Sequence, residues 1–383
     1  MIPYGRQSID EEDIRAVLEV LRSDWLTTGP KVTEFEELFA RKVGASHAVA
    51  VSSGTAALHV AACALGIGPG DEVIVPAMTF AATANCVVFQ GGTPVFADVD
   101  PETLLLDPDS AEARITRRTR AIIAVDYAGQ PCDYDALRAL ADRNGLVLAD
   151  DACHALGGMY KGKPVGSLAD LSTFSFHPVK HITSGEGGMV TTDDPDLARR
   201  MRLFRNHGIT TDHRQREVLG SWSYEMVDLG YNYRLTDIQC ALGASQLRKL
   251  PDWVRRRREI AAHYDTAFAD TPGVRPLAVR PDVFHACHLY VIRLEAREPG
   301  KDRAAVFRSL REAGIGVNVH YIPVHLHPFY RRRFGTGPGD CPVAEAAYER
   351  ILSLPMYPGM RDPDVEEVIG AVRRAVQGGG RCP

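Results

Sequence analysis

Long hydrophobic runs are missing from this sequence. No uninterrupted apolar stretch approaches the roughly 20 residues that a membrane-spanning helix requires. The first residues, MIPYGRQSIDEEDI, also lack the basic segment followed by an apolar one that marks a secretory signal peptide. We therefore expect a cytoplasmic protein without a membrane partner.

Paired cysteines and an excess of basic charge are missing too. The eight cysteines are scattered without a CxxC pair, which disfavours a disulfide framework or zinc site and suits buried thiols in a reducing compartment. The formal net charge is -5, so no global positive field exists to hold a nucleic acid. Two basic runs, 255–258 and 331–333, lie between apolar residues at helical spacing, and we interpret both as solvated helix faces. We expect no nucleic-acid partner.

What the sequence does contain is a pattern of alternating strands and helices. Ser8 and Glu11 have the spacing of a capping box and predict an N-terminal helix after them. From about residue 47 to 192, short hydrophobic runs such as HAVAVSS, EVIVPA and LVLADD alternate with helical segments. This pattern predicts an α/β fold with a mainly parallel sheet covered on both faces.

A segment with a different residue pattern follows a charged helical stretch at about 245–265. YVIRLE and VNVHYIPV are predicted strands, and AVFRSLREAG between them is a predicted helix. We therefore predict a large domain over residues 1–249, including the N-terminal helix, and a smaller C-terminal α+β domain over residues 250–383. The closing GGGRCP is predicted to be a frayed tail.

Polar residues after the predicted strands are candidates for a site, because such sheets bind ligands at the carboxyl ends of their strands. Gly54 and Thr55, in SSGTAAL, can offer backbone N–H groups and a hydroxyl to a phosphate, although similar residues begin many helices. Asp150 and Asp151 follow the strand LVLA, and one buried carboxylate there could keep a pyridinium nitrogen protonated. A metal site or a simple loop carboxylate are the alternatives. His154, three residues beyond, is by itself more typical of a satisfied hydrogen-bonding group than of a catalyst.

An aromatic residue and a lysine complete the candidates. Phe80, after EVIVPAMT, could stack on a flat ring or belong to the core, and the local pattern favours the core. Lys180 lies in FSFHPVKHITSGEGGM between two predicted buried strands. Partial desolvation there favours the unprotonated amine, which can attack an aldehyde and later shuttle protons. A lysine in a loop is otherwise most often a surface residue, and the apolar surroundings distinguish this one.

Four motifs, in order along the chain, carry a family resemblance. DYAGQP, DDACHALGGMYKG, FSFHPVKHITSGEGGM and GYNYRLTDIQCALGASQL together resemble the DegT/StrS family of sugar aminotransferases. The resemblance covers essentially the whole chain. It implies the fold type I (aspartate aminotransferase-like) architecture and the cofactor pyridoxal 5'-phosphate (PLP).

The resemblance also implies a catalytic set. Lys180 matches the Schiff-base lysine that moves a proton between the cofactor and the sugar carbon. Asp151 matches the carboxylate on the pyridine nitrogen, and His154 matches a ring neighbour near the cofactor hydroxyl.

The other implied contacts hold the cofactor. Gly54, Thr55 and Ser175 match the phosphate binders, and Phe80 matches the aromatic residue stacked on the ring. Asn232 in GYNYR matches an asparagine that reaches the phosphate of the neighbouring subunit. This last match implies a homodimer with shared active sites.

A closer resemblance concerns the substrate. MIPYGRQSID, DYAGQPCD, FSFHPVKHIT and GIGVNVHYIPVHLHPFY are similar to PseC-type enzymes of pseudaminic acid biosynthesis. Those enzymes transfer the amino group of L-glutamate to C4 of a UDP-linked 4-keto-6-deoxy-N-acetyl sugar. By this resemblance, Tyr4, His320 and Tyr321 are expected beside the nucleotide sugar. SSGTAAL departs from the NSATSAL-like form of many PseC-type sequences, although the phosphate cradle survives the change.

Several alternatives remain open. The histidines at 320, 325 and 327 could indicate a metal site, but no carboxylate or cysteine lies near them in the sequence, and we predict none. Pyridoxamine-dependent sugar dehydratases resemble this chain but carry histidine in place of Lys180, which argues for transamination. An aminotransferase for a dTDP-linked 3- or 4-keto-deoxysugar, and a non-catalytic PLP-binding regulatory protein, are the remaining hypotheses.

Overall fold

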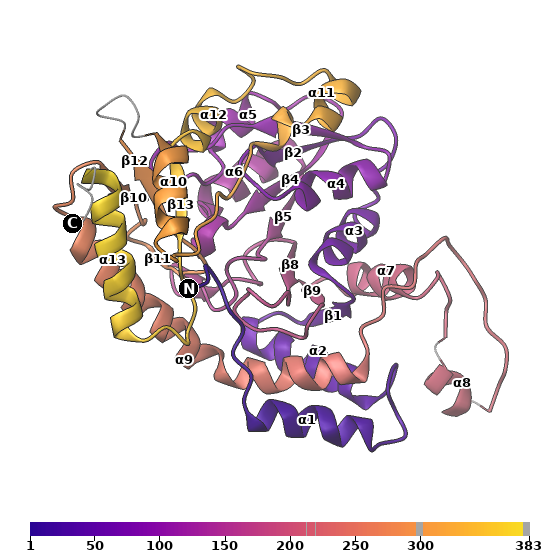
Figure 1. Ribbon diagram of the computed structural model, residues 1–383. Coiled ribbons are helices and arrows are strands. Elements are labelled where there is room, and N and C mark those ends of the chain that lie inside the picture. The colour runs from indigo at the N-terminus through magenta and orange to yellow at the C-terminus, as the bar shows by residue number, and fades with distance from the viewer. Residues whose placement is uncertain (212, 219, 296–301, 378–383) are drawn as a thin grey trace.

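The centre of the molecule is one large sheet. A computed structural model of the chain describes residues 1–211, 213–218, 220–295 and 302–377 (Figure 1). The seven-stranded sheet has the order β1-β9-β8-β5-β4-β2-β3. Its strands are β1 (His47–Val51), β2 (Glu72–Pro76), β3 (Thr93–Ala97), β4 (Thr119–Val125), β5 (Val147–Asp151), β8 (Leu171–Ser175) and β9 (Gly188–Thr192). β9 is antiparallel to both neighbours and the other pairs are parallel, so the predicted α/β class with a mainly parallel sheet is confirmed.

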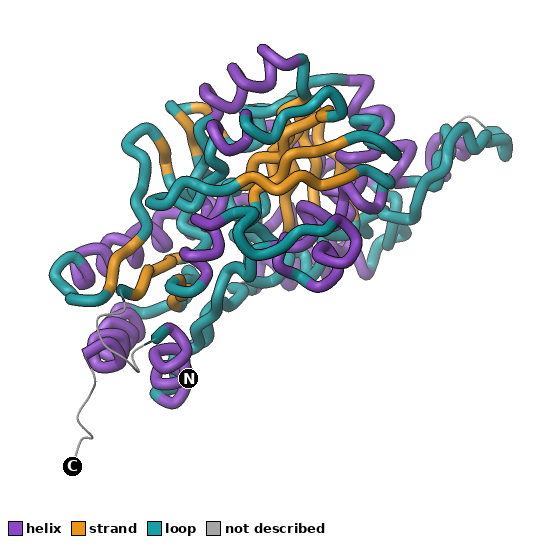
Figure 2. The backbone as a smooth tube through the Cα atoms, turned by 90° about the horizontal axis from the view of Figure 1, so that it is seen from above, coloured by secondary structure: helices purple, strands orange, loops and turns teal. Residues whose placement is uncertain are grey.

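Helices cover both faces of this sheet, as Figure 2 shows. Successive side chains of a strand point to opposite faces. In β1, Val49 and Val51 therefore belong to one hydrophobic cluster, while Ala48 and Ala50 belong to another. The first cluster includes α3 (Gly54–Ala64) and α4 (Ala81–Phe89), and the second includes α2 (Pro30–Val43) and part of α9 (Asp237–Phe268). Further helices of the large sheet's layers are α5 (Pro108–Glu112), α6 (Tyr134–Asn144) and α7 (Pro195–Arg205).

The predicted N-terminal helix is α1 (Glu11–Leu21), but its cap differs from the prediction. Asp10, not Ser8, is the N-cap, because its side chain accepts from the backbone N–H groups of Glu12 and Asp13. Asp13 completes the capping box and also pairs with Lys249 of α9, with 2.9 Å between Oδ1 and Nζ. α1 is thereby held against α9, beside which it lies in Figure 1.

A second, smaller sheet has the order β10-β12-β13, with strands β10 (Val274–Pro276), β12 (Tyr290–Leu294) and β13 (Ile351–Leu354). It is packed by α10 (Arg303–Glu312), α13 (Asp362–Gln377) and the C-terminal half of α9. A third sheet joins β6 (Met159–Tyr160), β7 (Lys163–Pro164) and β11 (Val283–Phe284). Helices α11 (Pro328–Phe334) and α12 (Pro342–Tyr348) follow α10 in the chain but pack in the hydrophobic cluster of the large sheet.

The prediction of a strand over VNVHYIPV is wrong. Asn318 makes a single bridge with Ser353 of β13, and the chain then leaves the small sheet. Its later N–H groups turn to the large domain, since Tyr321 N–H points to Met78 Sδ and Val324 N–H donates to the Ala77 carbonyl. The segment has strand-like composition but crosses between two layers, so it cannot continue one ladder.

α9 belongs to both halves of the molecule. Its side chains up to Val254 pack in the cluster with α2, and those from Ile260 onward pack in the cluster of the small sheet. Ile2 also joins that small-sheet cluster, because its backbone pairs with Gly314 and Gly316. The division at 249/250 lies inside this continuous helix and stays a prediction.

Residues 206–232 form a segment that projects from the body and carries α8 (His213–Val218) near its end (Figure 1). Bridges between Asn206 and Asn232 and between Ile209 and Met226 join its two sides. The segment carries large apolar side chains that stay exposed, with Trp222 at 89% and Leu229 at 69%. The predicted tail, 378–383, lies outside the described residues.

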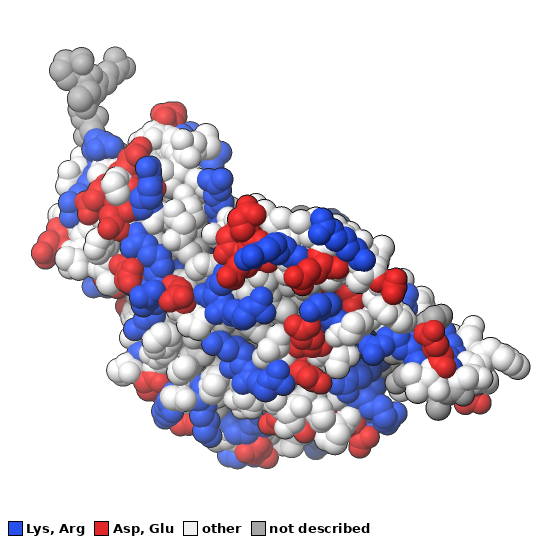
Figure 3. All heavy atoms as spheres, turned by 90° about the horizontal axis from the view of Figure 1, so that it is seen from below, with Lys and Arg blue, Asp and Glu red and all other residues white. Residues whose placement is uncertain are grey.

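The surface carries mixed charge on the face drawn in Figure 3, where basic and acidic side chains are interspersed. Arg331, Arg332 and Arg333 are exposed on α11, as predicted for a solvated face. Arg257 in the other basic run is instead buried and donates to the carbonyls of Cys287, His288 and Met356. The prediction for this run is therefore wrong at one position, because helical periodicity turns Arg257 inward. No helix within the described ranges is long and apolar enough to cross a bilayer.

Candidate active site

A cavity of about 550 Å³ opens at the carboxyl ends of the parallel strands. Ser53 follows β1, and Val125, Asp151 and Ser175 end β4, β5 and β8, all in its wall. Ligands of doubly wound sheets bind at this edge. The predicted site residues in the wall are Tyr4, Gly54, Thr55, Phe80, Asp151, His154, Ser175, Lys180, His320 and Tyr321.

One end of the cavity is the N-terminus of α3. Ser53 caps the helix by accepting the Ala56 N–H at 3.1 Å, and the Gly54 and Thr55 N–H groups have no partner within the part of the chain that the structure describes. A Cβ at Gly54 would lie 2.8 Å from the Cβ of Ser175, so only glycine lets the helix start come this close to β8. Free N–H groups at a helix start and nearby hydroxyls form an anion site.

Asp151 lies at the other side of the cavity with its carboxylate anchored. Oδ2 accepts the Thr83 hydroxyl at 2.6 Å, and Oδ1 accepts the Cys153 N–H at 3.3 Å. Thr83 in turn bonds to Thr79 at 2.8 Å, and all of these groups are buried except the half-buried Cys153. An anchored, buried carboxylate is a strong partner for a cationic ring nitrogen.

Asp150 points to the opposite face of the sheet, as alternation along β5 requires. Neither of its side-chain oxygens has a hydrogen-bond partner among the described residues, and burial together with Asp126 raises its pKa well above the ordinary range. Asp150 therefore lies outside the cavity, and of the two candidate carboxylates only Asp151 faces it.

Lys180 extends from the loop after β8 into the cavity. The residue is half-buried, and its Nζ makes no hydrogen bond or ion pair within the described segments. Burial lowers the pKa of this amine, while the nearby Cys153 and Asp151 partly oppose the shift. A desolvated amine without a partner is the form of lysine that attacks a carbonyl.

Three aromatic groups meet beside Lys180. The Tyr321 hydroxyl lies 3.0 Å from His154 Nε2, and His288 from the small half lies against His154 with ring centroids 4.4 Å apart. Burial lowers the pKa of both histidines well below the ordinary value, so both are neutral. His154 Nδ1 is buried and has no hydrogen-bond partner in the described structure.

Phe80, Tyr4 and His320 border the opening. Phe80 is 59% exposed at the start of α4, so the core interpretation that its local sequence favoured is wrong. The Tyr4 and His320 rings lie 5.8 Å apart. His320 Nδ1 bonds to the Ser353 hydroxyl at 2.8 Å, and burial lowers its pKa to about 4. Neutral polar rings at a mouth can accept and donate hydrogen bonds to a polar substrate.

Asn232, which is expected to act on the neighbouring subunit, does not line the cavity of its own chain, and its role stays a prediction. Cys153, one of the thiols expected to be buried, lines the cavity. The sequence analysis missed Thr83 and His288. Thr83 could have been recognised as a hydroxyl-bearing residue shortly after a predicted strand. Nothing in the local sequence around His288 indicates that it lines the cavity. His320 and His325 have different partners: His320 bonds to Ser353, whereas the buried His325 bonds to Glu345 at 2.9 Å. No group of three metal ligands occurs among the described residues.

Comparison with known proteins decides the family. Residues 7–373 match the model of the DegT/DnrJ/EryC1/StrS aminotransferase family. The chain belongs to this family. It is 47% identical over 379 residues to the spore coat polysaccharide biosynthesis protein SpsC of Bacillus subtilis (strain 168), a match that covers 98% of this chain and 97% of SpsC.

Solved structures agree with this assignment. The putative sugar aminotransferase Spr1654 from Streptococcus pneumoniae, in its PMP form, superimposes with a TM-score of 0.93 and 36% identity over 98% of this chain and 99% of that one. Helicobacter pylori PseC, an aminotransferase involved in the biosynthesis of pseudoaminic acid, gives a TM-score of 0.92 and 34% identity over 99% and 100%. The chain is thus a fold type I sugar aminotransferase.

This aminotransferase uses PLP, because Spr1654 was solved in PLP and PMP forms and the residues present fit the group. The helix start with its free N–H groups suits the phosphate, and the buried Asp151 carboxylate suits the pyridine nitrogen. The partnerless Lys180 Nζ suits the aldehyde.

Gly54→Ala should weaken PLP binding by at least about tenfold, because a methyl group would force α3 away from Ser175 and misplace the phosphate-facing N–H groups. Gly68→Ala is the matched control, since nothing lies within 4 Å of a Cβ there. Titration of apoenzyme with PLP, followed by absorbance, measures both constants. Equal affinities of the two variants would contradict a cradle at α3.

The rate of covalent PLP attachment to apoenzyme should rise with pH and level off below pH 10.5, the ordinary pKa of the lysine amine. Only the unprotonated Nζ reacts, and burial moves its pKa down. Asp151→Asn should shift the profile further down, because the Asp151 charge raises this pKa. Asp150→Asn, at a residue that points to the opposite face of the sheet, should leave it unchanged. Stopped-flow absorbance gives the profiles, and a plateau at or above pH 10.5 would contradict desolvation at Lys180.

Proposed function

We propose that this enzyme transfers the amino group of L-glutamate to C4 of a UDP-linked 4-keto-6-deoxy-N-acetyl sugar, as in pseudaminic-acid-type nucleotide-sugar biosynthesis. The observation that carries the proposal is the free Nζ of Lys180 in one cavity with the anchored Asp151 and the α3 N-terminus. Full-length similarity to PseC at 34% identity supports the sugar and the nucleotide.

Lys180 is the proton carrier in this proposal. PLP supplies an electron sink for charge that develops at the carbon bearing the transferred nitrogen. Lys180 Nζ takes the proton from the glutamate α-carbon and, in the second half-reaction, moves a proton at the sugar carbon. Its lowered pKa makes the neutral amine available for the first of these transfers.

Asp151 holds positive charge at the ring nitrogen. The Thr83 hydroxyl and the Cys153 N–H fix its two oxygens, so the carboxylate does not rotate when charge moves in the ring. His154 and Tyr321 form a neutral hydrogen-bonded pair beside Lys180 that can bond the cofactor hydroxyl without competing for the lysine proton. Phe80 offers its exposed ring face for stacking.

Tyr4, His320 and Tyr321 are the proposed contacts of the nucleotide sugar. Tyr4 comes from the N-terminal segment, whose carbonyl accepts the Met356 N–H, and His320 comes from the crossing segment held to Ser353. Both elements therefore belong to the small half, while Lys180 belongs to the large one. A substrate between them would contact both halves of the molecule.

We also propose a homodimer with shared active sites, in which Asn232 reaches the cofactor phosphate of the partner. Asn232 lies at the base of the projecting segment and outside the cavity of its own chain. The exposed Trp222, Met226 and Leu229 of that segment are large apolar side chains of the kind that a subunit interface covers.

The same tests distinguish the proposed function from two alternative functions. The similarity to SpsC, a spore coat polysaccharide protein, fits an aminotransferase for a dTDP-linked 3- or 4-keto-deoxysugar equally well. A non-catalytic PLP-binding regulatory protein would tolerate a broken catalytic set, but Lys180, Asp151 and His154 all line this cavity.

Holoenzyme should lose its PLP absorbance band when L-glutamate is added and regain it when a UDP-linked 4-keto-6-deoxy-N-acetyl sugar follows. Lys180→Ala should lower the turnover rate at least about a thousandfold, because both half-reactions need its amine. Lys163→Ala, at an exposed site in β7, is the control and should retain activity. Turnover of dTDP-linked keto-sugars alone would replace the proposed substrate, and an unchanged band with glutamate would exclude that donor.

Mixing two inactive variants should restore activity if the sites are shared. Lys180→Ala chains still supply Asn232, and Asn232→Asp chains, whose new charge repels the phosphate, still supply Lys180. Random exchange of subunits leaves about one quarter of the sites with both intact residues. Recovery near that fraction after co-refolding supports Asn232 acting on the partner, and no recovery indicates that it acts within its own chain or not at all.

A further inference from the structure

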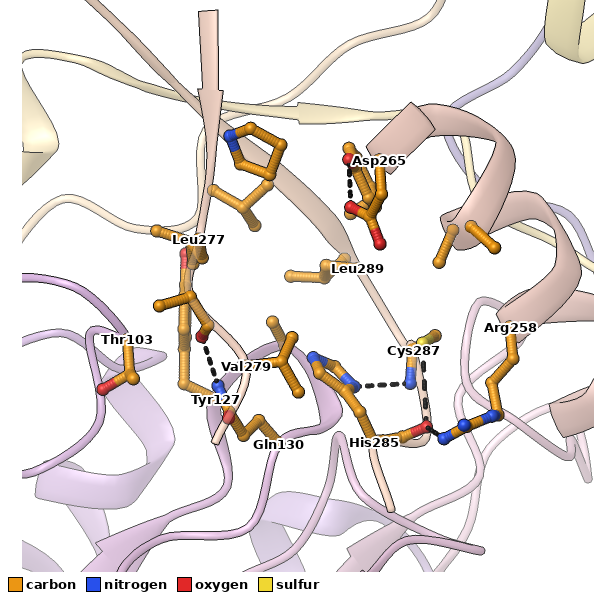
Figure 4. Close-up of a pocket in the computed structure, with 17 residues that line it drawn as sticks. Thr103, Tyr127, Gln130, Arg258, Asp265, Leu277, Val279, His285, Cys287 and Leu289 are labelled. Atoms are coloured by element: carbon orange, nitrogen blue, oxygen red, sulfur yellow. Dashed lines mark hydrogen bonds between the residues drawn. The ribbon is translucent and has the colours of Figure 1, made fainter. Parts of the chain in front are cut away.

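A second cavity, of about 250 Å³, lies behind the active site and shares no lining residue with it. Figure 4 shows its walls. One wall is α9, with Arg258 and Asp265, and another is the segment from His285 to Val291. Leu277 and Val279 lie on the side away from α9, and Leu289 lies between them and the helix. The middle of the cavity is therefore apolar.

Charged groups mark the two ends of the α9 wall. Arg258 and Asp265 are seven residues apart, which places them about 10 Å apart along the helix axis. Arg258 lies over the Phe284 ring at 3.9 Å and donates weakly to the His285 carbonyl at 3.4 Å. Asp265 Oδ1 accepts the Tyr290 hydroxyl at 2.6 Å. Neither side chain has an ion-pair partner in the described ranges, so a cation end and an anion end face one apolar space.

His285 adds a hydrogen-bond donor at the Arg258 end. Its Nδ1 accepts the Cys287 N–H at 2.8 Å, and burial beside Arg258 lowers its pKa to about 4. The ring is therefore neutral, and with Nδ1 as acceptor its hydrogen must lie on Nε2. Figure 4 shows the imidazole directed into the cavity. Arg258 and the Nε2–H group are thus separate donors, on different sides of the His285 ring.

We propose that this second cavity is a binding site for a small α,ω-zwitterion, a molecule with a carboxylate and an ammonium group joined by a short apolar chain. The carboxylate binds Arg258, the ammonium binds Asp265, and the chain lies on Leu277, Val279 and Leu289.

Other ligand classes fit less well. The α-carboxylate and α-ammonium of an ordinary amino acid are too close together to reach both ends of the α9 wall. A phosphate-bearing ligand long enough to fill the space would bring negative charge toward Asp265. A plain fatty acid would leave the Asp265 carboxylate beside a methyl group and partly desolvated. Since a cavity of about 150 Å³ takes benzene, this one has room for about ten non-hydrogen atoms.

The wall between the two cavities connects this site to catalysis. Along the chain, His285, Cys287 and Leu289 face the second cavity, whereas His288 faces the active site and packs on His154. The Tyr127 side chain also lines the second cavity, and its hydroxyl donates to the carbonyl of His320. A ligand that orders this wall therefore acts on groups that contact His154 and His320.

Isothermal titration of the PLP-loaded enzyme with 6-aminohexanoate tests the site without any sugar substrate. Saturable binding is expected, with affinity at least about tenfold above that of hexanoate or hexylamine, because each of these lacks one charged end. Asp265→Asn and Arg258→Gln should each weaken binding by at least about tenfold, and Asp265→Asn keeps an acceptor for Tyr290. Glu259→Gln, an exposed charge change on α9 outside the cavity, is the control and should bind as the parent does.

Melting temperatures of the four proteins show whether the variants remain folded. The absence of saturable binding by the parent enzyme would overturn the proposal. Binding that persists unchanged in both Asp265→Asn and Arg258→Gln would overturn it too, because the probe would then lie in the PLP cavity or elsewhere. Neither outcome bears on the sugar substrate, so this proposal and the proposed function fail separately.

Discussion

A reactive amine at Lys180 requires that Nζ be kept from water while the Asp151 charge stays in the same cavity. Burial lowers the pKa of the amine and the Asp151 carboxylate raises it, so the two demands oppose each other. The structure reconciles them by giving Asp151 its own donors, Thr83 and the Cys153 N–H, so that the lysine is not needed as its counter-ion. Nζ therefore stays free, and the remaining features of the site surround this arrangement.

The large sheet provides one side of the active-site cavity. Its parallel strands end together, which brings the α3 N-terminus, Asp151 and the loop of Lys180 to one edge although they are 29 to 126 residues apart in sequence. The acid next in sequence, Asp150, is turned to the other face, where burial raises its pKa. Only one carboxylate of the DD pair thus lines the cavity.

The small half closes the cavity through segments that have no regular structure of their own. The crossing segment with His320 and Tyr321 and the wall with His288 are both held by backbone contacts to neighbouring elements. Arg257 anchors the second of these by donating to the Cys287 and His288 carbonyls from within α9. The same helix forms a wall of the second cavity, so α9 links the two cores and both cavities.

Local sequence was sufficient for the fold class and for much of the cavity. Continuous hydrophobic runs between helices occur in buried parallel strands, and a parallel sheet brings the polar residues after its strands to one edge. Gly54, Asp151 and Lys180 could be found in this way, and the motif resemblance added Ser175 and His154.

Tertiary structure alone decided what depends on contacts between distant segments. VNVHYIPV has the composition of a strand but leaves the small sheet after one bridge, and Arg257 lies in a basic run but is buried by α9 packing. Phe80 resembles a core residue, yet it stands exposed at the cavity. His288 enters the site from the other half of the molecule. The side chain of a residue is directed by the periodicity of its own element, but what it meets there is set by elements far away in the chain.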